Sequence, residues 1–363
     1  MLTSLERTLC RLHQRSYCVT LSSGTLGLTL TMEALGLQGK GVAVPAGVCL
    51  DVPLSVHYSG ASPVYCDIDL QTLGLSLGTL KPHAHRCMAV LAVHAYGNMC
   101  EIQAIEDHCL IRGIPLIEDV ALAQGARVGE RPAGSFGAAS ILSFGAGKVI
   151  DVGGGGAVLT DDRALAVAIR DRYQGLPLQS HNDVEDIKAL SKWHTNIYNS
   201  SNGLCQGLYH PRFADAALHL RSAILTRHSW DADGVKRKIQ NLAETIARRR
   251  QLVSQLHRLV ATQVPSARFQ PPVEDGVPWR ANLFLARDRD RVLRSLLEEK
   301  MKISSWHPPA QYFLSKSLDQ ITPNAQSIGE QILNVWVNDE VDENYLIAVA
   351  SRIAALTLPK VIN

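Results

Sequence analysis

The stretch Ser140-Ile-Leu-Ser-Phe-Gly-Ala-Gly-Lys148 decides how the rest of the chain is interpreted. Its apolar part, residues 140–144, is typical of a buried strand, and small residues lead from there to Lys148. The glycines at 153–156 follow, and residues 157–160 form a second strand-like run. A lysine sequestered among small residues can have a lowered amine pKa, which covalent chemistry on its nitrogen requires.

Two other interpretations of Lys148 have to be weighed. A lysine taken at random is nearly always exposed, so a surface lysine in a flexible loop is the ordinary alternative. A phosphate loop of an NTPase is excluded, because the GxxxxGK[ST] spacing is absent and Val149 follows the lysine.

Strand-like and helix-like runs alternate through the first half of the chain. The strand-like runs are residues 42–45, 63–67, 87–94, 114–118, 140–144 and 157–160, and the helical patterns are about 25–35, 52–58, 101–112 and 164–173. This alternation predicts an α/β fold with a mostly parallel sheet flanked by helices on both faces. Binding residues are then expected at the carboxyl ends of strands and at helix N-termini.

The length of 363 residues is too great for one ordinary core, so two domains are expected. We predict a large domain at residues 1–233, with an irregular segment at 174–224, and a small C-terminal α/β domain at 234–363. The small domain is expected to contain a long helix at about 234–261, strands at 279–286, 303–306 and 334–337, and helices at 291–300, 325–333 and 341–355.

Ser22-Ser23-Gly24-Thr25 stands directly before a helical pattern. Small residues let a ligand approach the backbone, and the free N–H groups of a helix N-terminus suit a phosphate. An ordinary serine or threonine N-cap is the alternative.

Asp119 ends the strand-like run that contains Ile117 and Glu118. A carboxylate at the edge of a sheet can hold a pyridine nitrogen protonated, and a protonated ring is the better electron sink. A capping aspartate at a strand–helix turn is the alternative. At another strand end, His94 is expected to be a packed, hydrogen-bonded histidine and not a catalyst.

Composition excludes several classes of protein. The net charge of +2 gives no reason to expect nucleic acid as a partner. The eight cysteines include no CxxC pair and no zinc spacing, so a metal is not expected and a reducing cytoplasm is. The first 16 residues have no apolar core, so a signal peptide is not expected, and neither is a membrane span.

The order of these pieces resembles the DegT/StrS-type sugar aminotransferases. The resemblance is densest from Ser22 to Asp162, and it is thinner through residues 278–284, 304–309 and 328–345. It implies the pyridoxal-phosphate-dependent transferase fold of the aspartate aminotransferases and pyridoxal 5'-phosphate (PLP) as cofactor. It also implies a homodimer whose subunits share active sites.

Position by position, the resemblance assigns roles. Lys148 matches the lysine that carries PLP as a Schiff base and moves the proton, and Asp119 matches the partner of the ring nitrogen. The phosphate-binding positions are matched by Gly24, Thr25 and Ser143. His210 begins the nearest counterpart of an Asn-x-Arg element with which the neighbouring subunit completes the site.

Departures from the family pattern surround the cofactor ring. Cys49 or a neighbour occupies the place of an aromatic residue, and Leu122 replaces a glutamine that holds the ring hydroxyl. Gln124 replaces a histidine, and Gly154 replaces an acidic residue.

The resemblance implies transfer of an amino group from glutamate or glutamine to a keto-sugar, expected to be nucleotide-linked, in amino-sugar biosynthesis. Trp193, His194, Trp306 and His307 are candidates for the acceptor pocket, with core or interface positions as the alternative. Other PLP chemistry (a dehydratase, a lyase or carbon–carbon bond formation) stays open because of Cys49 and Leu122. Retention of Lys148 favours transamination, since relatives that dehydrate sugars have histidine there. A PLP-fold protein that only binds a ligand is the third possibility.

Overall fold

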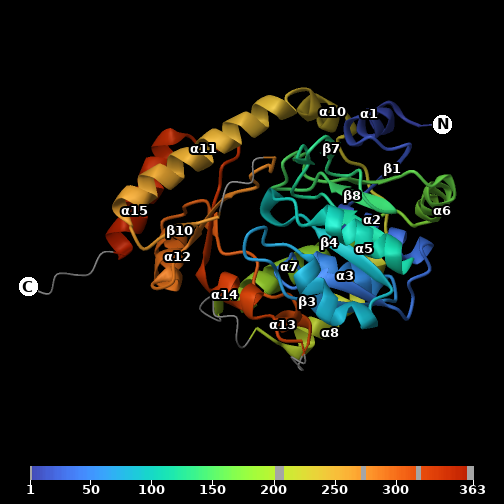
Figure 1. The fold of residues 1–363 in the computed structure, drawn as a ribbon, viewed down its shortest axis with the longest axis horizontal. Helices are drawn as coiled ribbons and strands as arrows, with labels where there is room; N and C mark the ends of the chain where they lie inside the picture. Colours follow the sequence, from blue (N-terminus) through green and yellow to red (C-terminus); the bar gives the residue numbers. More distant parts are fainter. Residues whose placement is uncertain (1, 201–207, 271–274, 316–319, 358–363) are drawn as a thin grey trace, which may run out of the picture.

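The computed structural model describes residues 2–200, 208–270, 275–315 and 320–357. A seven-stranded sheet occupies the first half of the chain, in the order β1-β9-β8-β5-β4-β2-β3 (Figure 1). Only β9 runs antiparallel to its neighbours. The strands are β1 (Tyr17–Leu21), β2 (Gly41–Pro45), β3 (Ser62–Cys66), β4 (Ala89–Val93), β5 (Leu116–Asp119), β8 (Ala139–Ser143) and β9 (Gly156–Thr160).

Both faces of this sheet are buried, as the continuously apolar strands predict. In β4, Leu91 and Val93 belong to one apolar cluster, whereas Val90 and Ala92 belong to another on the opposite face. The first cluster also contains residues of α2 (Gly24–Ala34) and α3 (Asp51–Tyr58), and the second contains residues of α1 (Ser4–His13) and α5 (Ile102–Arg112). The predicted α/β fold with a mostly parallel, helix-covered sheet is therefore confirmed.

The remaining elements of the first 175 residues are short or peripheral. They are α4 (Leu77–Leu80), the 3-10 turns η1 (Lys81–Arg86) and η2 (Ala95–Gly97), the hairpin β6 (Arg127–Val128) and β7 (Arg131–Pro132), and α6 (Arg163–Gln174).

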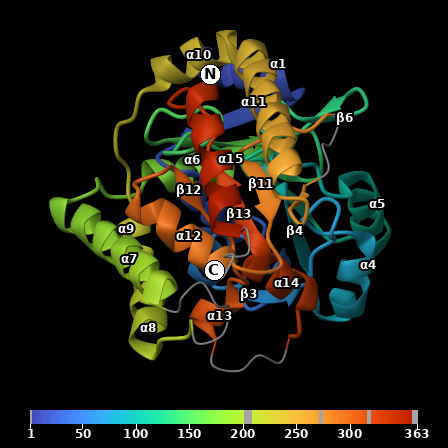
Figure 2. The same ribbon diagram turned by 90° about the vertical axis from the view of Figure 1, so that its left-hand side faces the viewer.

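A second sheet lies in the last third of the chain. It is antiparallel, in the order β10-β11-β13-β12, with strands β10 (Arg268–Phe269), β11 (Ala281–Phe284), β12 (Ile303–Ser304) and β13 (Ile332–Val335). A separate apolar cluster joins it to α11 (Leu242–Gln263), α12 (Arg289–Glu298) and α15 (Glu343–Thr357). In Figure 2, α11 and α15 lie side by side over this sheet.

The segment 174–224 was expected to be irregular, and this expectation is wrong for its described residues. It forms α7 (His181–Ser200), α8 (Pro211–His219) and α9 (Arg221–Ile224), while residues 201–207 lie outside the described chain. Leu190, Trp193 and Ile197 recur at helical spacing on α7 and pack against the large core. Tertiary packing thus stabilises a helix whose polar composition gives a weak sequence signal.

The long helix expected at 234–261 is divided in two. It consists of α10 (Ala232–Gln240) and α11, and Asn241 between them has a φ of −102° and a ψ of 11°. The chain closes through α13 (Gln311–Leu314), α14 (Pro323–Gln331) and α15. Phe313 of α13 belongs to the core of the large sheet, so the last third of the chain also packs on the first. No described helix is long and apolar enough to cross a membrane.

Candidate active site

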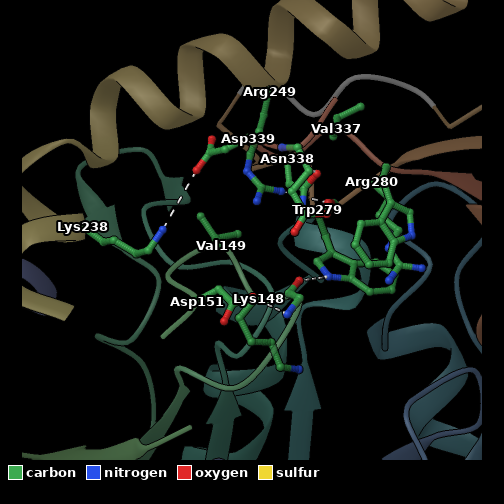
Figure 3. Close-up of a pocket in the computed structure, with 13 residues that line it drawn as sticks. Lys148, Val149, Asp151, Lys238, Arg249, Trp279, Arg280, Val337, Asn338 and Asp339 are labelled. Atoms are coloured by element: carbon green, nitrogen blue, oxygen red, sulfur yellow. Dashed lines mark hydrogen bonds and ion pairs between the residues drawn. The ribbon is translucent and has the colours of Figure 1, made fainter. Parts of the chain in front are cut away.

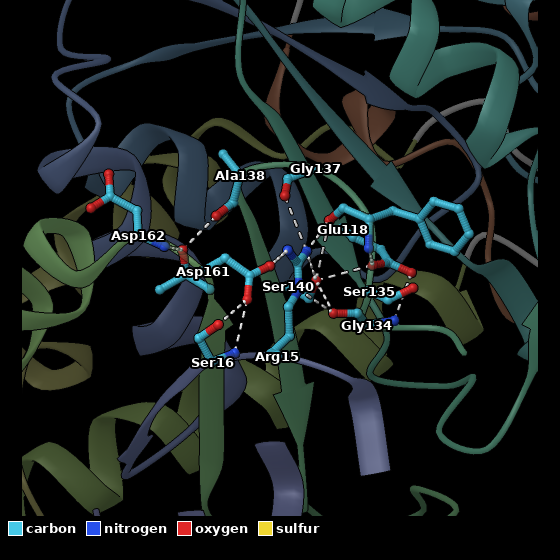
Figure 4. A network of polar contacts seen from close by, with 12 residues as sticks. Arg15, Ser16, Glu118, Gly134, Ser135, Gly137, Ala138, Ser140, Asp161 and Asp162 are labelled. Atoms are coloured by element: carbon cyan, nitrogen blue, oxygen red, sulfur yellow. Dashed lines mark hydrogen bonds and ion pairs between the residues drawn. The ribbon is translucent and has the colours of Figure 1, made fainter. Parts of the chain in front are cut away.

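A buried network fixes the carboxyl end of β5. Glu118 accepts hydrogen bonds from the His94 ring nitrogen (2.9 Å), the Gly134 N–H (2.8 Å) and the Ser140 hydroxyl (3.0 Å). The Arg15 guanidinium donates to the same Ser140 hydroxyl (3.1 Å) and to Asp161 (2.8 Å), as Figure 4 shows.

Burial opposes ionisation of Glu118, but the hydrogen bonds from His94 and from backbone N–H groups outweigh it and hold its pKa below the ordinary value. The Cys100 N–H donates to Nδ1 of His94 (3.2 Å), so this nitrogen is an acceptor and the other ring nitrogen donates to Glu118. His94 is packed and hydrogen-bonded, as the sequence indicates.

Asp119, the next residue, lies at the end of β5 and is only 4% exposed. Its Oδ1 accepts a hydrogen bond from the Ala121 N–H (2.8 Å), and no hydrogen bond from the described residues reaches Oδ2. Burial raises the pKa of this carboxyl, while the Ala121 hydrogen bond and the positive charge of Lys148 oppose the rise. Asp119 and Lys148 are therefore within electrostatic reach of one another.

The loop that carries Lys148 is held by hydrogen bonds on its backbone. Asp151 accepts from the Gly147 N–H (2.6 Å) and the Gly153 N–H (2.8 Å), and Trp279 Nε1 donates to the Gly147 carbonyl (2.7 Å). In Figure 3 the Lys148 side chain leaves this loop away from Asp339 and extends toward the strands of the large sheet. Lys148 is half-buried, so it is not the fully exposed surface lysine of the ordinary alternative.

The N-terminus of α2 lies against the end of β8. A Cβ on Gly24 would lie 2.9 Å from the Ser143 Cβ, so glycine is needed for this close approach. Ser23 caps the helix by accepting from the Leu26 N–H (3.1 Å), which confirms the N-cap interpretation for Ser23. Thr25 lies in the first turn, where N–H groups have no intrahelical partner, and the Ser143 hydroxyl lies beside Gly24, so this arrangement suits a phosphate.

The residues that depart from the family pattern lie around the same edge. Cys49 is half-buried, and burial together with Asp51 raises the pKa of its thiol to about 12, although nearby Lys148 opposes this. Leu122 is buried in an apolar cluster with Tyr96 and Trp279. Gln124 donates from Nε2 to the Ser143 carbonyl (2.8 Å), and its buried Oε1 has no hydrogen-bond partner among the described residues.

A pocket of about 220 Å³ adjoins Lys148, and most of its wall comes from the last third of the chain. Besides Lys148, its lining includes Arg249, Trp279, Arg280 and Trp336 (Figure 3). None of these four was predicted as a site residue. The dipeptide Trp279-Arg280 was a visible signal, because an arginine inside a strand-like run is unusual, but nothing in the sequence connected it with Lys148.

Of the four residues expected in the acceptor pocket, His307 lies nearest to this site. It is stacked on Trp279 with ring centroids 6.0 Å apart, and its backbone N–H donates to the Tyr96 hydroxyl (2.8 Å). Burial, followed by the charges of Lys148 and Arg280, lowers the pKa of His307 to about 3. His307 is thus neutral at neutral pH and close enough to both cations to be affected by their charges.

The other three form an aromatic cluster with α8. His194 lies 5.1 Å from Trp306 and 5.8 Å from Phe213, and Trp193 lies 5.3 Å from His210, measured between ring centroids. His210 caps α8 by accepting at Nδ1 from the Phe213 N–H (3.3 Å). Within the described chain, these contacts do not bring His210 to Lys148. The family resemblance implies that His210 acts at the active site of a partner subunit.

Known proteins share this fold. The DegT/DnrJ/EryC1/StrS aminotransferase family matches residues 1–196. The dTDP-4-dehydro-2,3,6-trideoxy-D-glucose 4-aminotransferase of Saccharopolyspora spinosa is 29% identical over 341 residues, which is 92% of this chain and 83% of that protein. GDP-perosamine synthase of Vibrio cholerae is 37% identical over 163 residues, or 44% of each chain. The structure of the aminotransferase TlmJ from Streptoalloteichus hindustanus has a TM-score of 0.78 at 23% identity, covering 97% of this chain and 89% of that one.

A helix-covered, mostly parallel sheet with a small antiparallel domain defines the class of PLP-dependent transferases. Within this class, the chain belongs to the DegT/DnrJ/EryC1/StrS aminotransferase family and is a PLP-dependent aminotransferase. The described residues fit the cofactor, since a free helix N-terminus, a buried carboxylate with one unengaged oxygen and a lysine converge on one edge of the large sheet.

Proposed function

We propose that this enzyme transfers the amino group of glutamate or glutamine to a small-molecule keto-sugar, in the biosynthesis of an amino sugar. The single observation that carries the proposal is the buried Asp119 carboxylate at the carboxyl end of β5, beside the parallel strand β8 that leads into the Lys148 loop. The names of the two sequence relatives support a nucleotide-linked acceptor. The first name includes a dTDP-linked sugar, and the second is GDP-perosamine synthase.

The roles of the individual residues are part of this proposal. The Lys148 amine would hold the cofactor and would move a proton at the substrate carbon. Asp119 would pair with the ring nitrogen of the cofactor and would keep that nitrogen protonated. The N–H groups of Gly24 and Thr25 and the hydroxyl of Ser143 bind the phosphate. When bound, PLP supplies an electron sink for the carbanion.

The ring surroundings assigned to Cys49 and Leu122 are unusual for the family, yet they leave this machinery intact. Burial raises the pKa of the Cys49 thiol to about 12, so the thiol is protonated at neutral pH and would face the cofactor as a neutral group. Leu122 contributes apolar surface where the family has an amide, so the ring hydroxyl loses one hydrogen bond. Both changes affect the properties of the cofactor and not the position of Lys148.

The proposal includes a homodimer with shared active sites and a cytoplasmic location. The dimer rests on the family resemblance, in which the element at His210 reaches the partner's site. Seven free cysteines among the described residues, six of them buried, are consistent with a reducing compartment.

The experiment that tests this function follows the amino nitrogen from the donor to the product. The enzyme with PLP is incubated with 15N-labelled L-glutamate and a panel of dTDP- and GDP-linked 4-keto-6-deoxy sugars, and products are analysed by mass spectrometry. Label in a nucleotide sugar establishes the function. Release of water, ammonia or a shortened carbon skeleton without label transfer would assign the enzyme to a different PLP chemistry. If no amino donor is turned over, the conclusion would be that the chain only binds a ligand.

A further inference from the structure

The guanidinium of Arg280 is enclosed by two indole rings. Its central carbon lies 3.9 Å from the ring centre of Trp279 and 4.6 Å from that of Trp336. Stacking between two aromatic faces fixes the plane of a guanidinium without using its N–H donors. The side chain is therefore held in one orientation, with donors left for another group.

A chain of buried amides holds Arg280 from behind. Its Nη1 donates to the Ser304 hydroxyl, which donates to Asn334 Oδ1 (2.9 Å). Asn334 in turn donates to Asn282 Oδ1 (2.8 Å), and both asparagines are at most 2% exposed. This network runs across the small sheet from β12 through β13 to β11, so three paired strands position Arg280.

No carboxylate of the described residues forms an ion pair or hydrogen bond with Arg280, although three carboxylates line the same pocket. Asp151 accepts the two backbone N–H groups of the lysine loop, Asp339 lies 4.0 Å from Lys238, and Glu340 pairs with Lys302. The acidic groups are thus engaged elsewhere, and Arg280 carries a charge that its own chain does not neutralise.

Arg249 is a second cation beside Arg280 and adds to the positive charge of this pocket. Arg249 is 5% exposed, donates to the Trp279 carbonyl (2.9 Å) and has a buried Nε without a hydrogen-bond partner among the described residues. Burial, followed by the charge of Arg249, lowers the pKa of Arg280 to about 9, so Arg280 is still charged at neutral pH. Asp339 and Asp151 act on Arg249 from a distance, but no carboxylate of the described residues pairs with Arg280, so an anionic ligand would offset the cost of enclosing its charge.

Arg280 and Lys148 line one pocket and act on one side chain. Both contribute to the wall of this pocket, and the charges of both lower the pKa of the nearby His307. A group bound to Arg280 therefore lies beside the reacting amine.

We propose that Arg280, supported by Arg249, binds a carboxylate of the amino donor. The inference rests on the proposed function and specifies which residue selects its donor. A planar guanidinium matches a carboxylate with two parallel hydrogen bonds. The pocket volume of about 220 Å³ lies below the range of about 300–1,000 Å³ that drug-sized ligands occupy, so it suits an amino acid better than a nucleotide.

The first test needs neither cofactor nor turnover. Glutarate, a dicarboxylate without an amine, is titrated into the apoenzyme while tryptophan fluorescence is recorded, because Trp279 and Trp336 flank Arg280. We expect binding that is about 10- to 100-fold weaker in Arg280→Met, from the loss of a charge-assisted pair. The matched control is Arg268→Met, which removes an exposed arginine from β10 of the same sheet and should bind like the wild type.

The second test uses the enzyme with PLP. The wild type should react with L-glutamate about 10- to 100-fold faster than with its dimethyl ester, which has no carboxylate, and this ratio should fall toward one in Arg280→Met. The proposal is overturned if Arg280→Met and the wild type bind glutarate equally well. It is also overturned if Arg280→Met keeps the preference for L-glutamate over the dimethyl ester. Tighter, Arg280-dependent binding of inorganic phosphate than of glutarate would overturn it in favour of a phosphate on the acceptor. Arg280-dependent glutarate binding in a protein whose cofactor ignores glutamate would support the anion site and refute the proposed function.

Discussion

Trp279 Nε1 donates a 2.7 Å hydrogen bond to the carbonyl of Gly147, the residue before Lys148. Trp279 stands just before β11 of the small sheet, whereas Lys148 follows β8 of the large sheet. The hydrogen bond therefore joins the two sheets at the proposed reacting lysine. It also places Arg280, the next residue, on the wall of the same pocket.

Replacing Trp279 by phenylalanine keeps a ring beside Arg280 and removes the hydrogen bond to Gly147. Losing a hydrogen bond of this kind costs about 0.5–1.5 kcal/mol, so PLP affinity should fall about two- to tenfold. Equilibrium titration of the apoenzyme with PLP, followed by visible absorbance, measures it. Trp336→Phe is the control, since Trp336 also stacks on Arg280 but makes no hydrogen bond to the Lys148 loop among the described residues. Equal losses in both variants would refute the role of this hydrogen bond.

Asp119→Asn retains an acceptor for the Ala121 N–H and removes the negative charge. If Asp119 keeps the cofactor nitrogen protonated, the rate with glutamate should fall about 10- to 100-fold, the amount expected from losing a hydrogen bond to a charged group. Stopped-flow absorbance with L-glutamate measures the rate, and circular dichroism checks the fold. An undiminished rate in a folded Asp119→Asn protein would show that this carboxylate does not serve the cofactor.

Glu118→Gln should destabilise the fold, and it changes no residue assigned to the cofactor. It removes a buried carboxylate that accepts from His94, Ser140 and backbone N–H groups, so the free energy of unfolding should fall by about 3 kcal/mol. Urea denaturation at pH 7 measures this loss. Glu185→Gln, which changes an exposed carboxylate, is the control.

The same variant has a predicted dependence on pH. The folded pKa of Glu118 lies below its ordinary value of 4.5, so the unfolded chain binds the proton more readily. The stabilisation is fully present above pH 4.5 and is lost as the pH falls through the lower, folded pKa. The difference in unfolding free energy between wild type and Glu118→Gln should therefore shrink below pH 4.5. A constant difference across that range would contradict this account.

Leu122→Gln restores the family's amide beside the proposed ring hydroxyl. Because Leu122 lies in an apolar cluster, the new amide should cost about 1–3 kcal/mol of stability unless PLP provides it with a partner. We expect PLP to raise the melting temperature of Leu122→Gln more than that of the wild type, measured by thermal denaturation with and without PLP. An equal rise in both proteins would place the ring hydroxyl elsewhere.

Much of this arrangement could be predicted from local sequence. The five parallel strands and the N-terminus of α2 are marked by continuous apolar runs and by Ser23 before Gly24. Strand β1 was missed, because Tyr17–Leu21 is a short run whose pairing with distant β9 is needed to identify it. Its neighbour in the sheet lies about 140 residues away, and local patterns carry no such information.

The part of the site that sequence did not predict comes from long-range packing. Arg280 looks like a residue of an ordinary strand until Trp279, Trp336 and Ser304 are seen around it. Likewise, His307 becomes significant only through the charges of Lys148 and Arg280. Arg280 lies 24 residues from Ser304 and 56 from Trp336, and His307 lies 159 residues from Lys148, so periodicity and motif spacing could not reveal these contacts.

The most direct test of the central claim is the visible spectrum of the protein with PLP, recorded for wild type and Lys148→Ala. A lysine-bound cofactor band should appear in the wild type, be absent from Lys148→Ala, and give way to the amine form of the cofactor when L-glutamate is added. A band that persists in Lys148→Ala, or no band in the wild type, would contradict the assignment of Lys148.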